Sequence, residues 1–348
     1  MEVIKYSDVV RRVVSHAQRV YSELSNDDAE AISVYLDTRI KHIWEFYPWP
    51  DVVRVEKRYY RDLYASATVY AAGKEVYYPT EDKYYQALRQ TNGQAPTDTS
   101  YWAESKQTYS GATWESGTTY AVGDVVENEA DGLFYAAHTA HTSSGTLTPT
   151  ATGGNSRWGV LTEFDKYVAW AQTGENEIFD IIDVYNSNPR TDRKAFTCNF
   201  YQSENGIQVI NGPNIVYVEY RQVVPNLLHK TWTNAATYKK EDVVRYPASG
   251  ADFDLYKATG DHTAYATTGG GNTANYPGAA GAPWALIQIP RDFRSYLAHG
   301  AAADLLLADE REQLGGIQNS LADKALAELL NKIERLEQQT KQLNVVTK

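Results

Sequence analysis

Apolar residues in the first fifty positions recur with the spacing of two amphipathic helices. The first stripe consists of Val9, Val10, Val13, Val14, Ala17, Val20, Tyr21 and Leu24. The second consists of Ile32, Tyr35, Leu36, Ile40 and Ile43, with Asn26 before it as the predicted N-cap. Side chains three and four positions apart share one helix face, so both segments are predicted to be helices. The second helix must end by residues 47–50, which read Tyr-Pro-Trp-Pro, because proline has no amide hydrogen to donate.

Between residues 164 and 229 the pattern changes to short apolar runs separated by turn residues. The runs cover residues 178–185, 196–201, 207–210 and 215–220. Asn-Ser-Asn-Pro, Glu-Asn-Gly and Asn-Gly lie between them, and such sequences are typical of tight turns. This part of the chain is therefore predicted to form a small antiparallel sheet.

Residues 289–348 return to a helical pattern, with Pro290 at the predicted helix start. The first stripe consists of Phe293, Leu297, Ala301, Leu305 and Ala308, and we expect Gly315 and Gly316 to break this helix. A final helix carries the narrow seam Leu326, Leu329, Ile333, Leu336 and Leu343, with the spacing of a coiled coil. A helix this polar is not stable alone, so its seam requires a partner surface. That surface belongs either to the chain's own N-terminal helices or to another protein.

An aromatic pattern occurs three times in the remaining segments. Each copy contains an aromatic residue, a central tyrosine, a turn residue, a valine, Tyr-x-Ala and a closing tryptophan. The aromatic positions are Tyr64, Tyr70, Tyr85 and Trp102; Trp114, Tyr120, Tyr135 and Trp158; and Trp232, Tyr238, Tyr256 and Trp284. The turn residues are Gly73, Gly123 and Glu241, the valines are Val76, Val126 and Val244, and the alanines are Ala87, Ala137 and Ala258. Since Glu241 replaces a glycine suited to positive φ, the turn of the third copy is expected to differ.

Each copy is predicted to be a miniature sheet held together by its rings. A unit of about 40 to 57 residues cannot build a deep core, so a few large aromatic side chains must supply the buried apolar area. The 27 tyrosines and 8 tryptophans of the chain agree with many small β units. We assign the twelve aromatic positions above a structural role.

This pattern resembles the small chitin-binding carbohydrate-binding modules of families 5 and 12, and the second copy matches it best. The resemblance implies sugar binding by aromatic residues directly after Tyr-x-Ala. The corresponding residues here are Arg89 and Gln90, Thr139 and Ala140, and Gly260 and Asp261. None of them is aromatic, so we favour a structural module. Sugar binding, with Tyr84 or Tyr265 as substitute rings, is the alternative.

Candidate catalytic and metal-binding groups are few. Asp180 and Asp183 are spaced for opposite faces of a strand, which does not suit a pair of glycosidase carboxylates. His138 and His141 lack a nearby carboxylate motif, and the single cysteine, Cys198, excludes an intrachain disulfide and a thiolate zinc site. We therefore expect no enzyme activity, no catalytic or metal site and no cofactor.

Charge and hydropathy restrict the partners. The formal net charge is −11, which does not suit a nucleic-acid-binding surface, since phosphate contacts require clustered Lys and Arg. No stretch approaches 18 apolar residues and the N-terminus shows no apolar signal region, so we expect synthesis in the cytoplasm and no membrane partner.

With the repeats set aside, the rest of the chain resembles the head-to-tail adaptor (connector) proteins of tailed bacteriophages. The resembling segments read IWEFYPWP, VYVEYR and IPRDFRSYLAHGAAADLLL. The predicted fold class is α+β, a helical adaptor scaffold with a small antiparallel sheet and three inserted all-β modules. The expected divisions are 1–58 (N-terminal helices), 59–107 (module 1), 108–163 (module 2), 164–229 (scaffold sheet), 230–288 (module 3) and 289–348 (C-terminal helices and tail).

The adaptor resemblance implies a structural virion protein that connects the portal to the tail. Its implied partners are further copies in a dodecameric ring, the portal protein and a tail or nozzle protein, with DNA passing through the lumen without specific binding. The implied location is the head-tail junction of the virion, with host cytoplasm during assembly. The resemblance favours docking of residues 333–348, with Leu336 and Leu343 as contacts, on the portal or a neighbouring subunit. The alternative function is that of a glycan-binding accessory protein of a virion tail or a secreted assembly.

Overall fold

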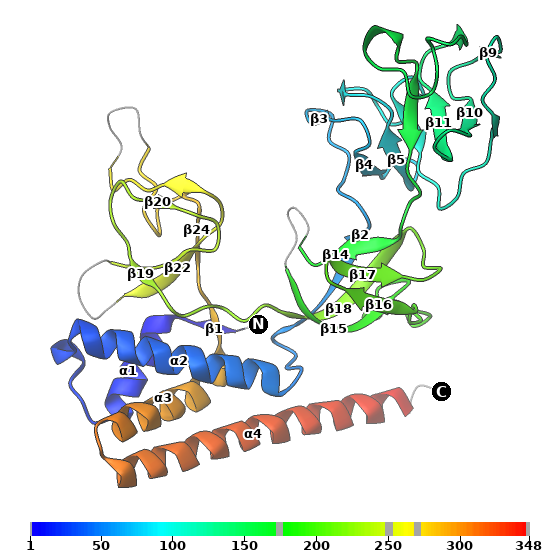
Figure 1. Cartoon of the computed structure of the whole chain (residues 1–348). Coiled ribbons are helices and arrows are strands. Elements are labelled where there is room, and N and C mark those ends of the chain that lie inside the picture. Colours follow the sequence, from blue (N-terminus) through cyan, green and yellow to red (C-terminus); the bar gives the residue numbers. More distant parts are fainter. Residues whose placement is uncertain (1, 172–176, 248–252, 268–272, 346–348) are drawn as a thin grey trace. The chain divides into compact units, whose positions relative to one another are not determined.

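The computed structural model describes residues 2–171, 177–247, 253–267 and 273–345, and side chains of the last helix as far as residue 335. The chain divides into two compact units, which we call the helical unit (Met1–Val52 with Val224–Lys348) and the β unit (Val53–Val223). Helices and many small, mainly antiparallel sheets occur together, so the predicted α+β class is confirmed at that level (Figure 1).

Four α-helices form the core of the helical unit. They are α1 (Tyr6–His16), α2 (Asn26–Phe46), α3 (Arg294–Ala308) and α4 (Glu312–Val345), with short 3-10 turns at η1 (Tyr21–Glu23) and η3 (Arg291–Phe293). Helix α3 packs against each of the other three helices. The shared core contains the predicted N-terminal stripes except Val20, which is 55% exposed, and the stripe of α3 except Ala308, which is exposed. Ile32, Ile40 and Leu297 are fully buried.

Three predicted helix ends differ from those observed. Helix α1 ends at His16, before the predicted stripe ends, because Gln18 has a positive φ of 58°. The N-cap of α2 is Ser25 rather than Asn26, and Ser25 forms a reciprocal capping box with Asp28. Helix α3 begins at Arg294, since Pro290 belongs to β25 (Ile289–Pro290), which pairs with β1 (Val3–Ile4).

The expected break at Gly315 and Gly316 is wrong, because α4 runs through both glycines. The chain turns earlier, at residues 309–311, between α3 and α4. A Cβ at Gly315 would lie 2.9 Å from Cγ of Leu307 on α3. The glycine therefore permits close packing of two helices rather than ending one.

Module 3 belongs to the helical unit. Its strands are β19 (Lys230–Thr231), β20 (Thr237–Tyr238), β21 (Val243–Tyr246), β22 (Asp254–Ala258), β23 (His262–Thr263) and β24 (Trp284–Leu286). They form the sheet β19-β21-β22-β24 and the separate pair β20-β23. Val243, Phe253 and Leu255 belong to the same hydrophobic core as α1 to α4, so module 3 and the helices share one interior.

The predicted scaffold sheet lies in the β unit as two three-stranded sheets. One has the order β15-β18-β2, from Ile178–Tyr185, Ile215–Gln222 and Val53–Tyr59. The other has the order β14-β17-β16, from Tyr167–Ala169, Gly206–Val209 and Phe200–Ser203. The expected boundary after residue 58 falls inside β2. The strand predicted over 196–201 is observed as β16, which begins four residues later, at Phe200. Phe196 is 62% exposed.

Modules 1 and 2 complete the β unit and pack against each other. Module 1 contains β3 (Val69–Tyr70), β4 (Glu75–Tyr78), β5 (Lys83–Ala87), β6 (Thr91–Asn92) and β7 (Trp102–Glu104). Module 2 contains β8 (Ala112–Thr113), β9 (Thr119–Tyr120), β10 (Val125–Asn128), β11 (Leu133–Ala137), β12 (His141–Thr142) and β13 (Trp158–Leu161). Gln86, fully buried, donates to the carbonyl of Val160 and accepts from the amide of Thr162 at 3.0 and 2.9 Å. These bonds join the two modules.

Candidate functional site

The central tyrosine of each module makes the same pair of hydrogen bonds. Its hydroxyl accepts from the amide and donates to the carbonyl of the residue five positions earlier. The pairs are Tyr70 with Ala65 (2.7 and 3.2 Å), Tyr120 with Glu115 (2.9 and 3.4 Å) and Tyr238 with Thr233 (2.8 and 3.4 Å). The ring fills the small core, and the hydroxyl provides hydrogen-bond partners for the backbone amide and carbonyl of a loop residue.

The closing tryptophans also recur in one geometry. Each indole nitrogen donates to a backbone carbonyl, and each ring meets its central tyrosine at a steep angle, with interplanar angles of 68°, 70° and 70°. The bonds join Trp102 to Gln94 (3.0 Å), Trp158 to Leu147 (3.3 Å) and Trp284 to Asn275 (2.8 Å). Buried positions are Tyr70, Tyr85, Trp102, Tyr120, Tyr135, Trp158, Trp232 and Tyr238; partly buried ones are Tyr64, Trp114, Tyr256 and Trp284. The predicted aromatic residues are thus brought together as three separate cores.

The turn after the central tyrosine is the same in all three modules, so the expected difference at Glu241 is wrong. The φ angles of Gly73, Gly123 and Glu241 are 83°, 91° and 74°. Each amide donates to the alanine carbonyl of Tyr-x-Ala, at 2.7, 2.7 and 2.9 Å. Glu241 keeps this turn despite its side chain, whose carboxylate lies 2.8 Å from Lys257 Nζ.

In module 1 the rings near Tyr-x-Ala are engaged within the chain. In module 1 the guanidinium of Arg89 lies 3.9 Å from the ring centroid of Tyr101 and covers it. Tyr84, one substitute ring, is 4% exposed, donates to the carbonyl of Asn214 and accepts from the amide of Tyr60. It is therefore a core residue. Tyr265, the other substitute, is partly buried and its amide is held by Asn275 Oδ1.

Several of the candidate chemical groups make local structural contacts. Nδ1 of His141 donates to the carbonyl of Thr139 at 2.8 Å, and the ring lies edge-on to Trp158. Asp180 lies 3.7 Å from Arg221. Burial raises the pKa of Cys198, which disfavours a reactive thiolate. Within the ranges that the structure describes, no three His, Cys, Asp or Glu side chains are grouped for a metal ion.

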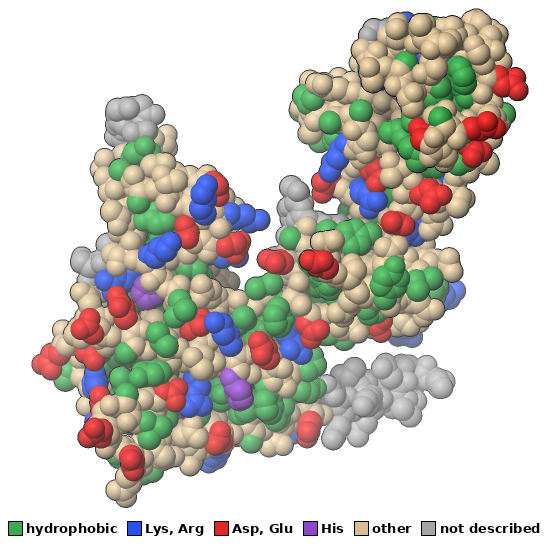
Figure 2. Space-filling view, viewed as in Figure 1, with side chains coloured by type: hydrophobic (Ala, Val, Ile, Leu, Met, Phe, Trp, Pro, Cys, Tyr) green, Lys and Arg blue, Asp and Glu red, His purple; other side chains and the backbone are tan. Residues whose placement is uncertain are grey.

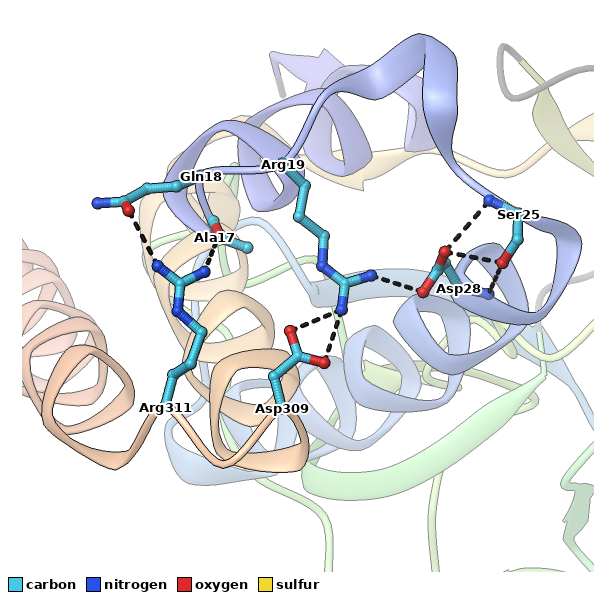
Figure 3. Close-up of polar contacts among 7 residues, drawn as sticks. All are labelled: Ala17, Gln18, Arg19, Ser25, Asp28, Asp309 and Arg311. Carbon is cyan, nitrogen blue, oxygen red and sulfur yellow. Dashed lines mark hydrogen bonds and ion pairs between the residues drawn. The ribbon is translucent and has the colours of Figure 1, made fainter.

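A polar clasp joins two connecting segments of the helical unit, residues 17–25 between α1 and α2 and residues 309–311 between α3 and α4 (Figure 3). Both oxygens of Asp309 accept from Nη2 of Arg19 at 2.6 Å, and Asp28 accepts from Nη1 at 2.5 Å. Arg311 donates to the carbonyl of Ala17 and to Oε1 of Gln18. The clasp therefore ties the α1–α2 connector to the α3–α4 connector.

The seam of α4 is partly used by the chain itself. Leu326 and Ile333 are buried in the helical core, and Lys332 donates to Asp292 at 2.5 Å. The helix continues to Val345, and the side chains of Leu336 and Leu343 lie outside the described residues. Packing on the chain's own helices therefore accounts for the seam as far as Ile333.

Comparisons with known proteins returned no match to a protein-family model and none to a curated protein. Among the described residues, no helix is both long and apolar enough to cross a membrane. Acidic and basic side chains are interspersed over the face in Figure 2.

Proposed function

We propose that this chain is a structural virion protein, a ring-forming head-to-tail adaptor that connects the portal to the tail. The observation that carries the proposal is the length of α4. Its 34 residues span about 51 Å, against about 22 Å for the 15 residues of α3, on which it packs. The backbone of α4 therefore extends past α3, and under this proposal the end of α4 contacts another chain.

The modules support a structural role. Their aromatic rings are used in their own cores, and module 3 is continuous with the helical interior. Under this proposal they act as rigid spacers and contact surfaces for a tail or nozzle protein, and the chain carries out no catalysis.

A dodecameric ring with DNA passing through its lumen follows from the adaptor resemblance. The net charge of −11 suits a protein that must lie near DNA without holding it. The location under this proposal is the head-tail junction of the virion.

Negative-stain microscopy of the purified chain, alone and mixed with its portal, tests the proposal. We expect closed rings that attach coaxially to the portal. Particles that remain monomeric at high concentration and do not attach to the portal would reject it. Calorimetry with soluble chitin oligomers provides the check on the glycan-binding alternative, for which micromolar affinity would be required.

A further inference from the structure

Arg12 of α1 and Arg294 of α3 lie near enough to each other, where the two helices pack, for their charges to interact. Neither Arg12 nor Arg294 makes a hydrogen bond or an ion pair within the described part of the chain, and Nε of Arg294 is buried without an acceptor. Burial lowers the pKa of Arg294, and the charges of Arg12 and Arg291 lower it further. Asp8 raises the pKa of Arg294 but forms no ion pair with it among the described residues, so both guanidinium groups can accept a carboxylate of a partner.

Two of the acids in this region, Glu2 and Asp292, are paired with other basic groups. Arg291 is paired with Glu2, and Lys332 with Asp292. His16 and His299 stack with ring centroids 4.1 Å apart, and Asp8 is the acid that acts on Arg294. We call the set Arg12, Arg291 and Arg294 the basic end.

Several exposed acidic residues lie close in the sequence to the residues of the polar clasp, at the other end of α3. We call these residues the acidic corner: Glu23, Asp27, Glu30, Glu310 and Glu312. The two arginines of the clasp are held by their own partners, Arg19 by two aspartates and Arg311 by Ala17 and Gln18. From Arg294 to the start of the corner, α3 rises about 22 Å. One copy can therefore use both surfaces at once.

We propose that the basic end of one copy docks against the acidic corner of the next copy. This inference rests on the proposed ring and names its subunit contact. Two different surfaces on each copy make a head-to-tail contact, and such contacts close into rings when the rotation allows. Val20, 55% exposed beside the corner, adds apolar surface to the contact.

A second copy fits the basic end better than nucleic acid does. The chain carries 44 acidic against 33 basic residues, so its long-range field repels phosphate chains. A copy of the same chain brings a concentrated acidic surface of matching charge. Interactions of this kind between exposed groups weaken as salt screens them.

Charge reversal tests the contact. Arg12→Glu with Arg294→Glu reverses the basic end, and Glu23→Lys with Glu310→Lys reverses the corner without touching the first turn of an α-helix. We expect either double variant to remain folded by circular dichroism and to require about tenfold more protein for ring assembly. The chain with all four changes should recover assembly, as should an equal mixture of the two double variants. Arg193→Glu, at an exposed arginine of the β unit, is the matched control and should assemble like the parent chain.

The outcomes separate this inference from the proposed function. Rings that form normally from both double variants would overturn the contact and leave the adaptor proposal standing. Failure of the four-change chain and of the mixture to assemble would also overturn it. A parent chain that forms no ring would reject both proposals. Tighter binding of a DNA duplex than of a second copy, measured by fluorescence anisotropy, would assign the basic end to phosphate instead.

Discussion

Modules 2 and 3 have the same strand order, the same pair of hydrogen bonds from the central tyrosine and the same turn. They pack differently against the rest of the chain. The interior of module 2 is a cluster of its own, Tyr120, Val126, Tyr135, Ala137 and Trp158. Module 3 has a corresponding cluster and in addition inserts Val243, Phe253 and Leu255 into the core of the helices. A repeat can therefore be an appended unit in one place and part of the main core in another.

The junction between module 3 and the helices explains this difference. The ring of Phe253 stacks on Tyr6 of α1 with centroids 5.6 Å apart, and Asp254 accepts from the amide of Ser7 at 3.1 Å. Asp37 of α2, 4% exposed, accepts from the amide of Leu227. Removal of module 3 would therefore open the helical core.

The largest effect is expected for Phe253→Ala. Loss of this buried ring should cost about 3–5 kcal/mol, because it leaves a cavity between module 3 and α1. We expect the helical signal and the protection of module 3 against hydrogen exchange to be lost in one transition. Phe196→Ala, at a 62% exposed ring, is the control and should change the midpoint little. Separate melting of module 3 would contradict the shared core.

Trp158→Ala should cost a similar 3–5 kcal/mol, but only in the β unit. Hydrogen exchange read by mass spectrometry should rise in module 2 while α1 to α4 stay protected. Val160→Ala, 40% exposed on the same strand, is the matched control. A loss of protection throughout the helices would show that module 2 also stabilises the main core.

Acid should weaken the junction of module 3 through His229. Burial lowers the pKa of His229 and Arg245 lowers it further, so the folded state disfavours the charged ring. Stability is then full above the unfolded pKa of about 6.5 and falls as the pH drops below it. His229→Gln should flatten the pH dependence of unfolding of the helical unit between about pH 7 and 5, measured by denaturant titration. The β unit should keep its own pH profile in the same variant.

The smallest expected effect is a gain from Glu241→Gly. Glycine adopts the observed φ of 74° without the steric cost that a side chain bears, which outweighs an exposed pair with Lys257. We expect stabilisation of module 3 by about 1 kcal/mol, the order of the steric cost of a left-handed conformation for a residue with a Cβ. Gly123→Ala, at the corresponding turn of module 2, should be destabilising. Equal stability of the parent and the glycine variant in thermal unfolding would contradict the strain at this turn.

The local parts of the fold could be read from the sequence. The N-terminal stripes, the strands 178–185 and 215–220 and the three aromatic repeats all depend on periodicities within one segment. The pairing of β2 with β18 could not be read, because it joins residues more than 150 positions apart. The contact between Phe253 and Tyr6 could not be predicted either, because the apolar pattern around Phe253 fits a strand of module 3 and does not indicate contact with α1.

Glycines and charged residues predicted the structure less well than the apolar patterns did. Gly315 was expected to end a helix, but its role depends on Leu307 of the facing helix. The basic end combines two short stretches, around residues 12 and 294, neither of which is notable alone. Its existence depends on the packing of α1 on α3.

Truncation of the last helix tests the adaptor account most directly. A chain ending at Arg335 keeps Leu326 and Ile333, so it should unfold at the same temperature as the full chain. Co-sedimentation with the portal, followed by microscopy, measures attachment. The account predicts that the full chain attaches as rings and that the truncated chain stays folded but does not attach. Equal attachment of both chains to the portal would contradict it.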